Sequence, residues 1–262
     1  MRFFFCALFV VSHYWCVVFA IISSHAPPEL YININLEEMS MKNYELTIED
    51  GVITLVEDTD ANGNPIPGIL YIPKEAVDFS TDAWVHLGCE ADAIVVHKDN
   101  PEFSSAHNCL LTKDGKKLLK TCKNSDVSQL KDLQTVGRDA FQSLNAERDE
   151  FVLRIPDGVE ALDYRACAIS ADRVEIIVPA SVVQVDLLAF MIHSRHTHII
   201  FEGDPHLQIG TFGTAAEAQH SGFDAYRKMP AVLYPKAENI AVTCLPGGRV
   251  SRYCNEYGIT EV

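Results

Sequence analysis

The sequence predicts a repeat solenoid, in which short parallel strands, irregular return arms and one hairpin island stack into a column. The first observation is a 23-residue period that relates Leu153-x-Ile155, Ile176-x-Val178 and Ile199-x-Phe201. The second is an independent register, since Ala166-Cys167 and Ala189-Phe190 are also 23 residues apart. Self-similarity at such a period is typical of stacked repeats. Two apolar residues at i and i+2 point to one face of a strand, and each copy buries that face only against its neighbours.

Composition describes a globular chain and argues against one class of partner. Of the 262 residues, 48% are hydrophobic, and 36 acidic against 21 basic side chains give a formal net charge of −15. No basic stripe is present, so binding to nucleic acid is disfavoured. An acidic surface favours solubility and cationic partners.

An apolar run from Phe3 to Ile22 sets residues 1–26 apart. Ser24 and Ala26 are small residues at the spacing of a signal-peptide cleavage site, and the length of the run fits a membrane anchor. A third interpretation makes the segment an upstream extension, with Met41 as the start. Residues 27–43 are predicted to be a linker.

The repeat domain is predicted over residues 44–262, and it opens with an N-terminal hairpin cap at 44–68. Asp50-Gly51 stands between two alternating apolar runs, which is a strong hairpin signal. A cap of this kind covers the open edge of a first repeat. Looser strands are expected at Leu70-x-Ile72 and, 24 residues later, at Ile94-x-Val96.

A hairpin island is predicted at residues 101–127, turned by Asp114-Gly115. The repeats then run from Leu130 to Phe212. Residues 213–236 are expected to be an insertion containing one irregular helix. A C-terminal cap is predicted over residues 240–262, with a last strand at Ile240-x-Val242, a helix from 247 to 257 capped by Ser251, and a closing strand.

These segments resemble the BspA-like leucine-rich repeat family. Ile155-Pro156-Asp157-Gly158-Val159 and Val178-Pro179-Ala180-Ser181-Val182 match its I-P-x-x-V segment, and Val136-Gly137-Arg138-Asp139-Ala140-Phe141 matches its I-G-x-x-A-F segment. Glu45 to Leu55 resembles a frequent opening of these proteins, which favours Met41 as the start. The resemblance implies a leucine-rich-repeat column. The family is associated with cell-surface proteins, adhesion and host contact, and it supplies no catalytic residues.

No motif of a hydrolase, zinc protease, P-loop or dinucleotide-binding protein is found, so the chain is predicted to be non-enzymatic and to use no cofactor. The metal-like cluster is His193-x-x-His196-x-His198, in which the last two share strand parity. No carboxylate or thiol completes the set at ligand spacing, so no metal site is predicted.

The candidate binding surface is the outward face of the strands. If Leu70, Ile94, Leu153, Ile176 and Ile199 point inward, then their neighbours point outward: Tyr71, Val95, Arg154, Ile177 and Ile200. Most of these are apolar, and Arg154 and His198 add polar groups. A contiguous apolar stripe usually marks a partner site. The alternative is that the stripe reflects only the β-propensity of branched residues.

The predicted function is therefore a binding module that presents its strand face to a protein or glycan, secreted or at the cell surface. The alternative is a cytoplasmic repeat scaffold or assembly protein that starts at Met41. Cys244 and Cys254 share the C-terminal end and are expected to form a disulfide in an oxidising compartment.

Overall fold

The computed structural model describes residues 6–11, 14–19, 43–57, 59–61, 66–86, 91–142, 149–220 and 235–262. It divides into two compact units, Met1–Ser40 and Met41–Val262. In the first unit, β1 (Cys6–Val11) and β2 (Tyr14–Phe19) form an antiparallel pair. The rest of the predicted segments 1–26 and 27–43 lies almost entirely outside the described residues. In the part of the chain that is described, no helix is long and apolar enough to cross a membrane.

The second unit opens with the predicted hairpin of β3 (Glu45–Glu49) and β4 (Val52–Glu57). Asp50 and Gly51 both have positive φ, as a tight two-residue hairpin turn requires. The pairing register shifts between Thr47 and Ile48, so Val56 is buried and Leu55 is exposed. The short strand β6 (Asp78–Phe79) pairs with β4 and completes this three-stranded sheet.

Two further strands confirm the 24-residue spacing seen in the sequence. β5 (Ile69–Ile72) and β7 (Ala93–Val96) are parallel, and Leu70 lies opposite Ile94. Helix α1 (Thr81–His86) lies between them in the sequence. Leu70 and Ile94 are both buried in the core of this N-terminal part.

The predicted hairpin island continues a sheet and does not interrupt it. β8 (Phe103–Ala106), β9 (Cys109–Thr112) and β10 (Lys117–Thr121) form an antiparallel meander. β10 then pairs in parallel with β11 (Thr135–Val136), so the island becomes the end of a seven-stranded sheet. Gly137 allows this close pairing: its amide donates to the Leu118 carbonyl at 2.8 Å, and a Cβ on it would lie 2.6 Å from that oxygen.

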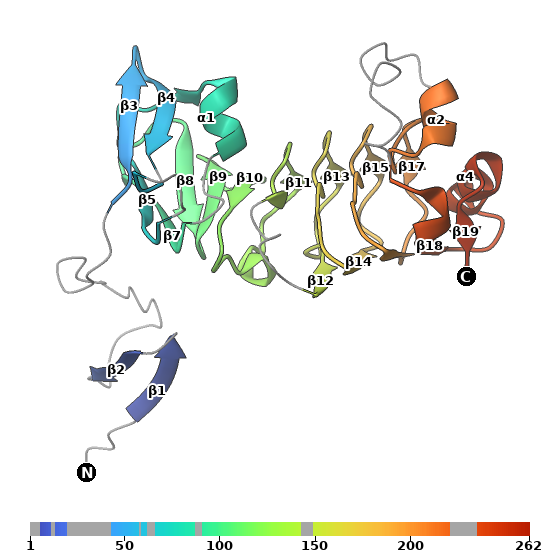
Figure 1. Cartoon of the computed structure of the whole chain (residues 1–262), viewed down its shortest axis with the longest axis horizontal. Coiled ribbons are helices and arrows are strands. Elements are labelled where there is room, and N and C mark those ends of the chain that lie inside the picture. Colours follow the sequence, from blue (N-terminus) through green and yellow to red (C-terminus); the bar gives the residue numbers. More distant parts are fainter. Residues whose placement is uncertain are drawn as a thin grey trace. The chain divides into compact units, whose positions relative to one another are not determined.

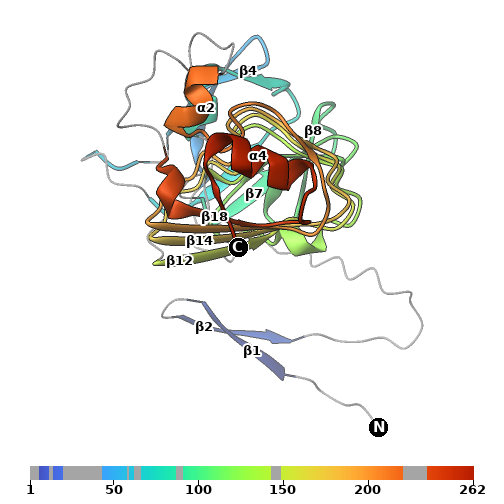
Figure 2. The ribbon, with the colours of Figure 1, turned by 90° about the vertical axis from the view of Figure 1, so that its right-hand side faces the viewer.

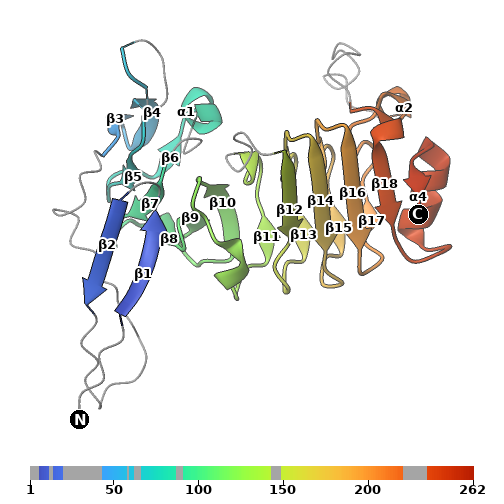
Figure 3. The ribbon, with the colours of Figure 1, turned by 60° about the horizontal axis from the view of Figure 1, so that its bottom comes forward.

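The seven-stranded sheet continues beyond β11 through three two-residue strands. These are β13 (Ala161–Leu162), β15 (Gln184–Val185) and β17 (His206–Leu207). The second large sheet holds five parallel strands. They are β12 (Glu150–Arg154), β14 (Arg173–Val178), β16 (His196–Phe201), β18 (Ile240–Thr243) and β19 (Thr260–Glu261). Figure 3 shows β12, β14, β16 and β18 of this sheet side by side. The chain alternates between the two sheets from β11 to β17, so many short parallel strands make up the C-terminal part.

The predicted strand register is confirmed. Leu153 pairs with Ile176, Ile176 with Ile199, and Ile199 with Val242. All four side chains are buried in one hydrophobic cluster that also takes in Val136, Leu162 and Val185 of the other sheet. The small-plus-aromatic pairs Ala140-Phe141 and Ala189-Phe190 are fully buried in the same cluster.

A left-handed residue stands before the small residue of each successive repeat. Asp139, Arg165, Leu188 and Gly210 have φ of 53°, 56°, 56° and 93°. Only glycine adopts this conformation without steric cost, which for other residues is about 1–2 kcal/mol. The Asp139 carboxylate is almost fully buried and accepts from Arg165 Nε at 2.7 Å and Arg138 Nε at 3.1 Å. These charge-assisted bonds fix the first turn to the second.

Helix α4 (Arg249–Tyr257) lies across the C-terminal end of the two large sheets, as Figures 1 and 2 show. Val250 and Cys254 of this helix are fully buried in the main core. The prediction that Ser251 caps the helix is wrong, because Gly248 is the N-cap. Ser251 lies inside the first turn, where its hydroxyl donates to Glu261 Oε2 at 2.7 Å.

The predicted insertion at 213–236 contains the six-residue helix α2 (Ala215–His220), and residues 221–234 lie outside the described part. Two 3-10 turns, η1 (Val127–Gln129) and η4 (Ala237–Asn239), also occur among the described residues. Glu217 of α2 is fully buried and accepts from the Phe212 and Thr214 amides and from the Thr214 hydroxyl, at 2.7–3.1 Å. It also accepts from the Tyr253 hydroxyl, which ties α2 to α4. Burial raises the pKa of Glu217 above its ordinary value, although the hydrogen bonds from these donors act to lower it.

Candidate functional site

The outward face of the five-stranded sheet carries three rows of side chains that run across the strands. The first row is Glu150, Arg173 and His196; the second is Val152, Glu175, His198 and Ala241; the third is Arg154, Ile177, Ile200 and Thr243. Each row member lies opposite its neighbour in the parallel pairing. Inward side chains alternate with these residues and are buried, so the rows face away from the core.

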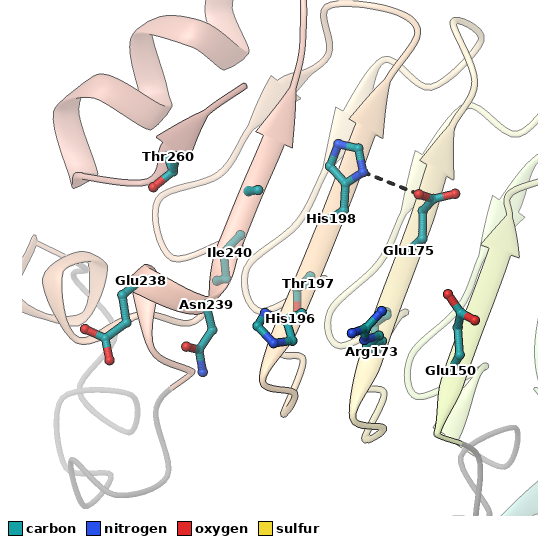
Figure 4. A pocket seen from close by; sticks show the side chains of 12 residues that line it. Glu150, Arg173, Glu175, His196, Thr197, His198, Glu238, Asn239, Ile240 and Thr260 are labelled. Atoms are coloured by element: carbon teal, nitrogen blue, oxygen red, sulfur yellow. Dashed lines mark hydrogen bonds and ion pairs between the residues drawn. The ribbon is translucent and has the colours of Figure 1, made fainter.

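The first row, together with Glu175, His198 and Ala241 of the second, lines an open groove of about 490 Å³, drawn in Figure 4. Glu238 and Asn239 of η4 and Thr260 of β19 complete its wall. The groove therefore contains three carboxylates, one guanidinium and two imidazoles. Such a mixture offers both donors and acceptors to a ligand.

His198 is held at the centre of this face by two neighbouring strands. Its Nδ1 lies 3.4 Å from Glu175 Oε2, and its Nε2 lies 2.8 Å from Thr243 Oγ1. An ionised carboxylate only accepts, so a neutral ring donates from Nδ1 to Glu175 and accepts from the Thr243 hydroxyl. The imidazole thus has a fixed orientation across β14, β16 and β18 (Figure 4).

Arg154 is bound within the face and is not a free polar group. Its guanidinium donates to both carboxylate oxygens of Glu202, at 2.8 and 2.9 Å, and to Asp157 Oδ1 at 3.2 Å. The bidentate contact spans from β12 to the end of β16, across β14, where Ile177 pairs with Arg154. These hydrogen bonds lower the pKa of Glu202 and raise that of Arg154.

The structure divides the predicted outward stripe into two parts. Arg154, Ile177 and Ile200 share the third row, and His198 lies in the second. Tyr71 and Val95 pair with each other on the separate sheet of β5 and β7, so a continuous stripe is wrong. The reason is that the chain between β7 and β12 builds β8 to β11 of the other sheet. The face is also less apolar than predicted, because charged and imidazole side chains fill the first row and the middle of the second.

Sequence reasoning missed Glu150, Arg173 and Glu175, although the same period contains them. Residues 150, 173 and 196 are 23 apart, and so are 152, 175 and 198. The predicted outward residues directly follow the inward residues Leu153, Ile176 and Ile199. The outward residues that precede those inward residues on the same strands were not included. Strand parity would have extended the face by these two rows.

His196 and His198 lie on one face of β16, as their parity predicts. His193 precedes this strand and lines a neighbouring hollow with Asp172, Arg195 and Lys236. Within the described ranges, no group of three or more His, Cys, Asp or Glu side chains could hold a metal ion.

Cys244 and Cys254 are free thiols in the structure, and their pairing stays a prediction. Burial raises the pKa of Cys244 to about 11 and that of Cys254 to about 12. Both are therefore protonated at neutral pH, which slows thiol–disulfide exchange because the thiolate is the reactive form.

No family model matches this chain, and no curated protein matches it. Among solved structures, the crystal structure of the pneumococcal vaccine antigen PcpA is similar, with 13% sequence identity and a TM-score of 0.41. The match covers 75% of this chain and 56% of that one, so the chain spans little more than half the length of the antigen. At these values the similarity assigns neither a family nor a function.

Proposed function

We propose that the second unit is a leucine-rich-repeat solenoid of the BspA-like type, and that it acts as a non-enzymatic binding module for a protein partner. The observation that carries the proposal is the outward face, whose rows cross three or four parallel strands in register. The 23-residue pairing of β12, β14 and β16, with a two-residue strand of the other sheet between them, supports the repeat architecture.

A protein suits this face better than a glycan. Val152 of the second row is 58% exposed, and Ile177 and Ile200 of the adjacent third row are half-buried. Apolar side chains of a partner can cover this patch, while the charged first row forms a polar rim. The three rows contain no Tyr, Trp or Phe, so the flat aromatic surface on which a sugar ring packs is missing.

We place the module outside the cell or at its surface, on the strength of the apolar run before Ile22. The second candidate is an intracellular scaffold or assembly protein that starts at Met41. One observation favours it: the larger compact unit begins at Met41. Sequencing the N-terminus of the native protein separates these candidates, since export predicts a terminus near Pro27.

The binding proposal is tested by comparing three forms of the full chain as bait for proteins of the source organism and its surroundings. The face variant is Ile177→Lys with Ile200→Lys. The matched control is Val183→Lys with Ile209→Lys, since these two residues are 61% and 46% exposed and flank β15 and β17 of the other sheet.

A partner of the face is captured by the wild type and the control and is lost by the face variant. Capture that is equal in all three forms refutes the proposal. Turnover of a hydrolase or transferase substrate that is abolished by a point change in the groove also refutes it.

A further inference from the structure

The groove differs in chemistry from the apolar pair Ile177 and Ile200 in the third row beside it. Its three carboxylates come from three different elements: Glu150 from β12, Glu175 from β14 and Glu238 from η4. Arg173 is the one fully charged cation that lines it within the described residues. With both imidazoles neutral, three negative charges and one positive charge give the groove a formal net charge of −2.

Few groups among the described residues neutralise these carboxylates. Glu175 contacts the ring of His198 at 3.4 Å, and Glu238 lies 3.9 Å from Lys236, a distance at which the attraction in water is weak. Glu150 is exposed, and within the described residues it makes no ion pair or side-chain hydrogen bond. The chain as a whole carries a net charge of −15, which draws cationic partners toward it.

We propose that this groove receives an extended segment of the protein partner that alternates basic and apolar side chains. This inference rests on the proposed function and names the chemistry of its partner. The basic side chains pair with Glu150, Glu175 and Glu238, and the apolar ones cover Val152 and the adjacent third row. An extended segment also exposes main-chain carbonyls, which the guanidinium of Arg173 can bind, because that side chain has no partner within the described residues.

The experiment uses the full chain and three probes: a fluorescein-labelled peptide of alternating lysine and valine, the same peptide with glutamate in place of lysine, and a neutral oligosaccharide. Binding is followed by fluorescence anisotropy for the peptides and by calorimetry for the sugar. The groove variant is Glu150→Gln with Glu175→Gln. The control is Glu75→Gln with Glu160→Gln, which removes the same charge from exposed positions outside the groove.

The lysine–valine peptide is expected to bind the wild type and the control equally and the groove variant about tenfold more weakly, as for the loss of two contacts at an interface rim. Its affinity is expected to fall as salt is added. Equal weakening in both variants means that only overall charge acts, and overturns the proposal. The proposal is also overturned if the glutamate peptide or the sugar binds and the lysine–valine peptide does not. It is overturned as well if none of the three probes binds.

These results are separable from the test of the proposed function. A partner that is lost only by the Ile177→Lys and Ile200→Lys variant, together with no lysine–valine binding, rejects the basic segment and keeps the binding module. If that variant still captures every partner of the wild type, the proposed binding module is rejected.

Discussion

Replacing Ile176 by alanine tests the direction of the outward face. Ile176 is fully buried in β14, between Leu153 of β12 and Ile199 of β16. Its neighbour Ile177 points to the opposite side and is half-buried. Two adjacent isoleucines of one strand thus have opposite environments, and substitutions in them are expected to have opposite effects.

The magnitude follows from the atoms removed. Isoleucine to alanine deletes three carbon groups, which at about 0.8 kcal/mol each gives about 2.4 kcal/mol of lost burial. The cavity left between the strands adds to this, so about 2–5 kcal/mol is expected. For a unit of this size each kcal/mol lowers Tm by about 2–4 °C, so Ile176→Ala lowers Tm by roughly 4–20 °C. Ile177→Lys with Ile200→Lys costs far less, about 0.5 kcal/mol for each position.

Thermal unfolding followed by circular dichroism measures both variants, with Ile199→Ala as a second core replacement. If the lysine changes unfold the protein and the alanine changes do not, the face is inverted. The proposals for the outward face and its groove are then lost as well. A small loss in both types of variant would mean that the strands are not packed as described.

Three further predictions concern other parts of the chain. Because the folded pKa of Glu217 is raised, its contribution is present below the ordinary pKa near 4.5 and is lost as pH rises through the folded value. The wild type therefore loses stability relative to Glu217→Gln on raising the pH above about 4.5, and a constant difference in unfolding free energy contradicts this. In exported material, Cys244 and Cys254 are expected to pair and to contribute about 2–3 kcal/mol; mass mapping that finds both thiols free counts against it. Edman sequencing of exported native protein is expected to begin near Pro27, and a terminus at Met41 removes the case for export.

The parts of the fold that repeat could be predicted, because a fixed spacing of buried residues determines which strands pair. Leu153, Ile176 and Ile199 were placed correctly for this reason. The strand at Ile240-x-Val242 was also predicted, but no fixed spacing gave the pairing of Val242 with Ile199. Turn chemistry was equally local, as the Asp-Gly hairpins show.

The other features depend on contacts that the local sequence does not encode. The pairing of β10 with β11 joins Leu118 to Val136, and no period relates these two residues. The division of the stripe follows from that pairing. Leu188 gives no sign of a left-handed conformation, since its neighbours in the fold impose it. The two rows of the groove follow the 23-residue period, but η4 and β19, which close it, belong to no repeat and were not predicted as part of a site.

Because β12, β14 and β16 pair in register, the width of the outward face can change independently of the side chains that it presents. Because Leu153 pairs with Ile176 and Ile176 with Ile199, one further 23-residue unit placed between β14 and β16 would have a matching inward residue on each side. It would widen the sheet by about 4.8 Å and add one residue to each row. Duplication of a single unit can thus extend the surface in fixed steps, while point changes at the row positions alter what that surface recognises and leave the core untouched.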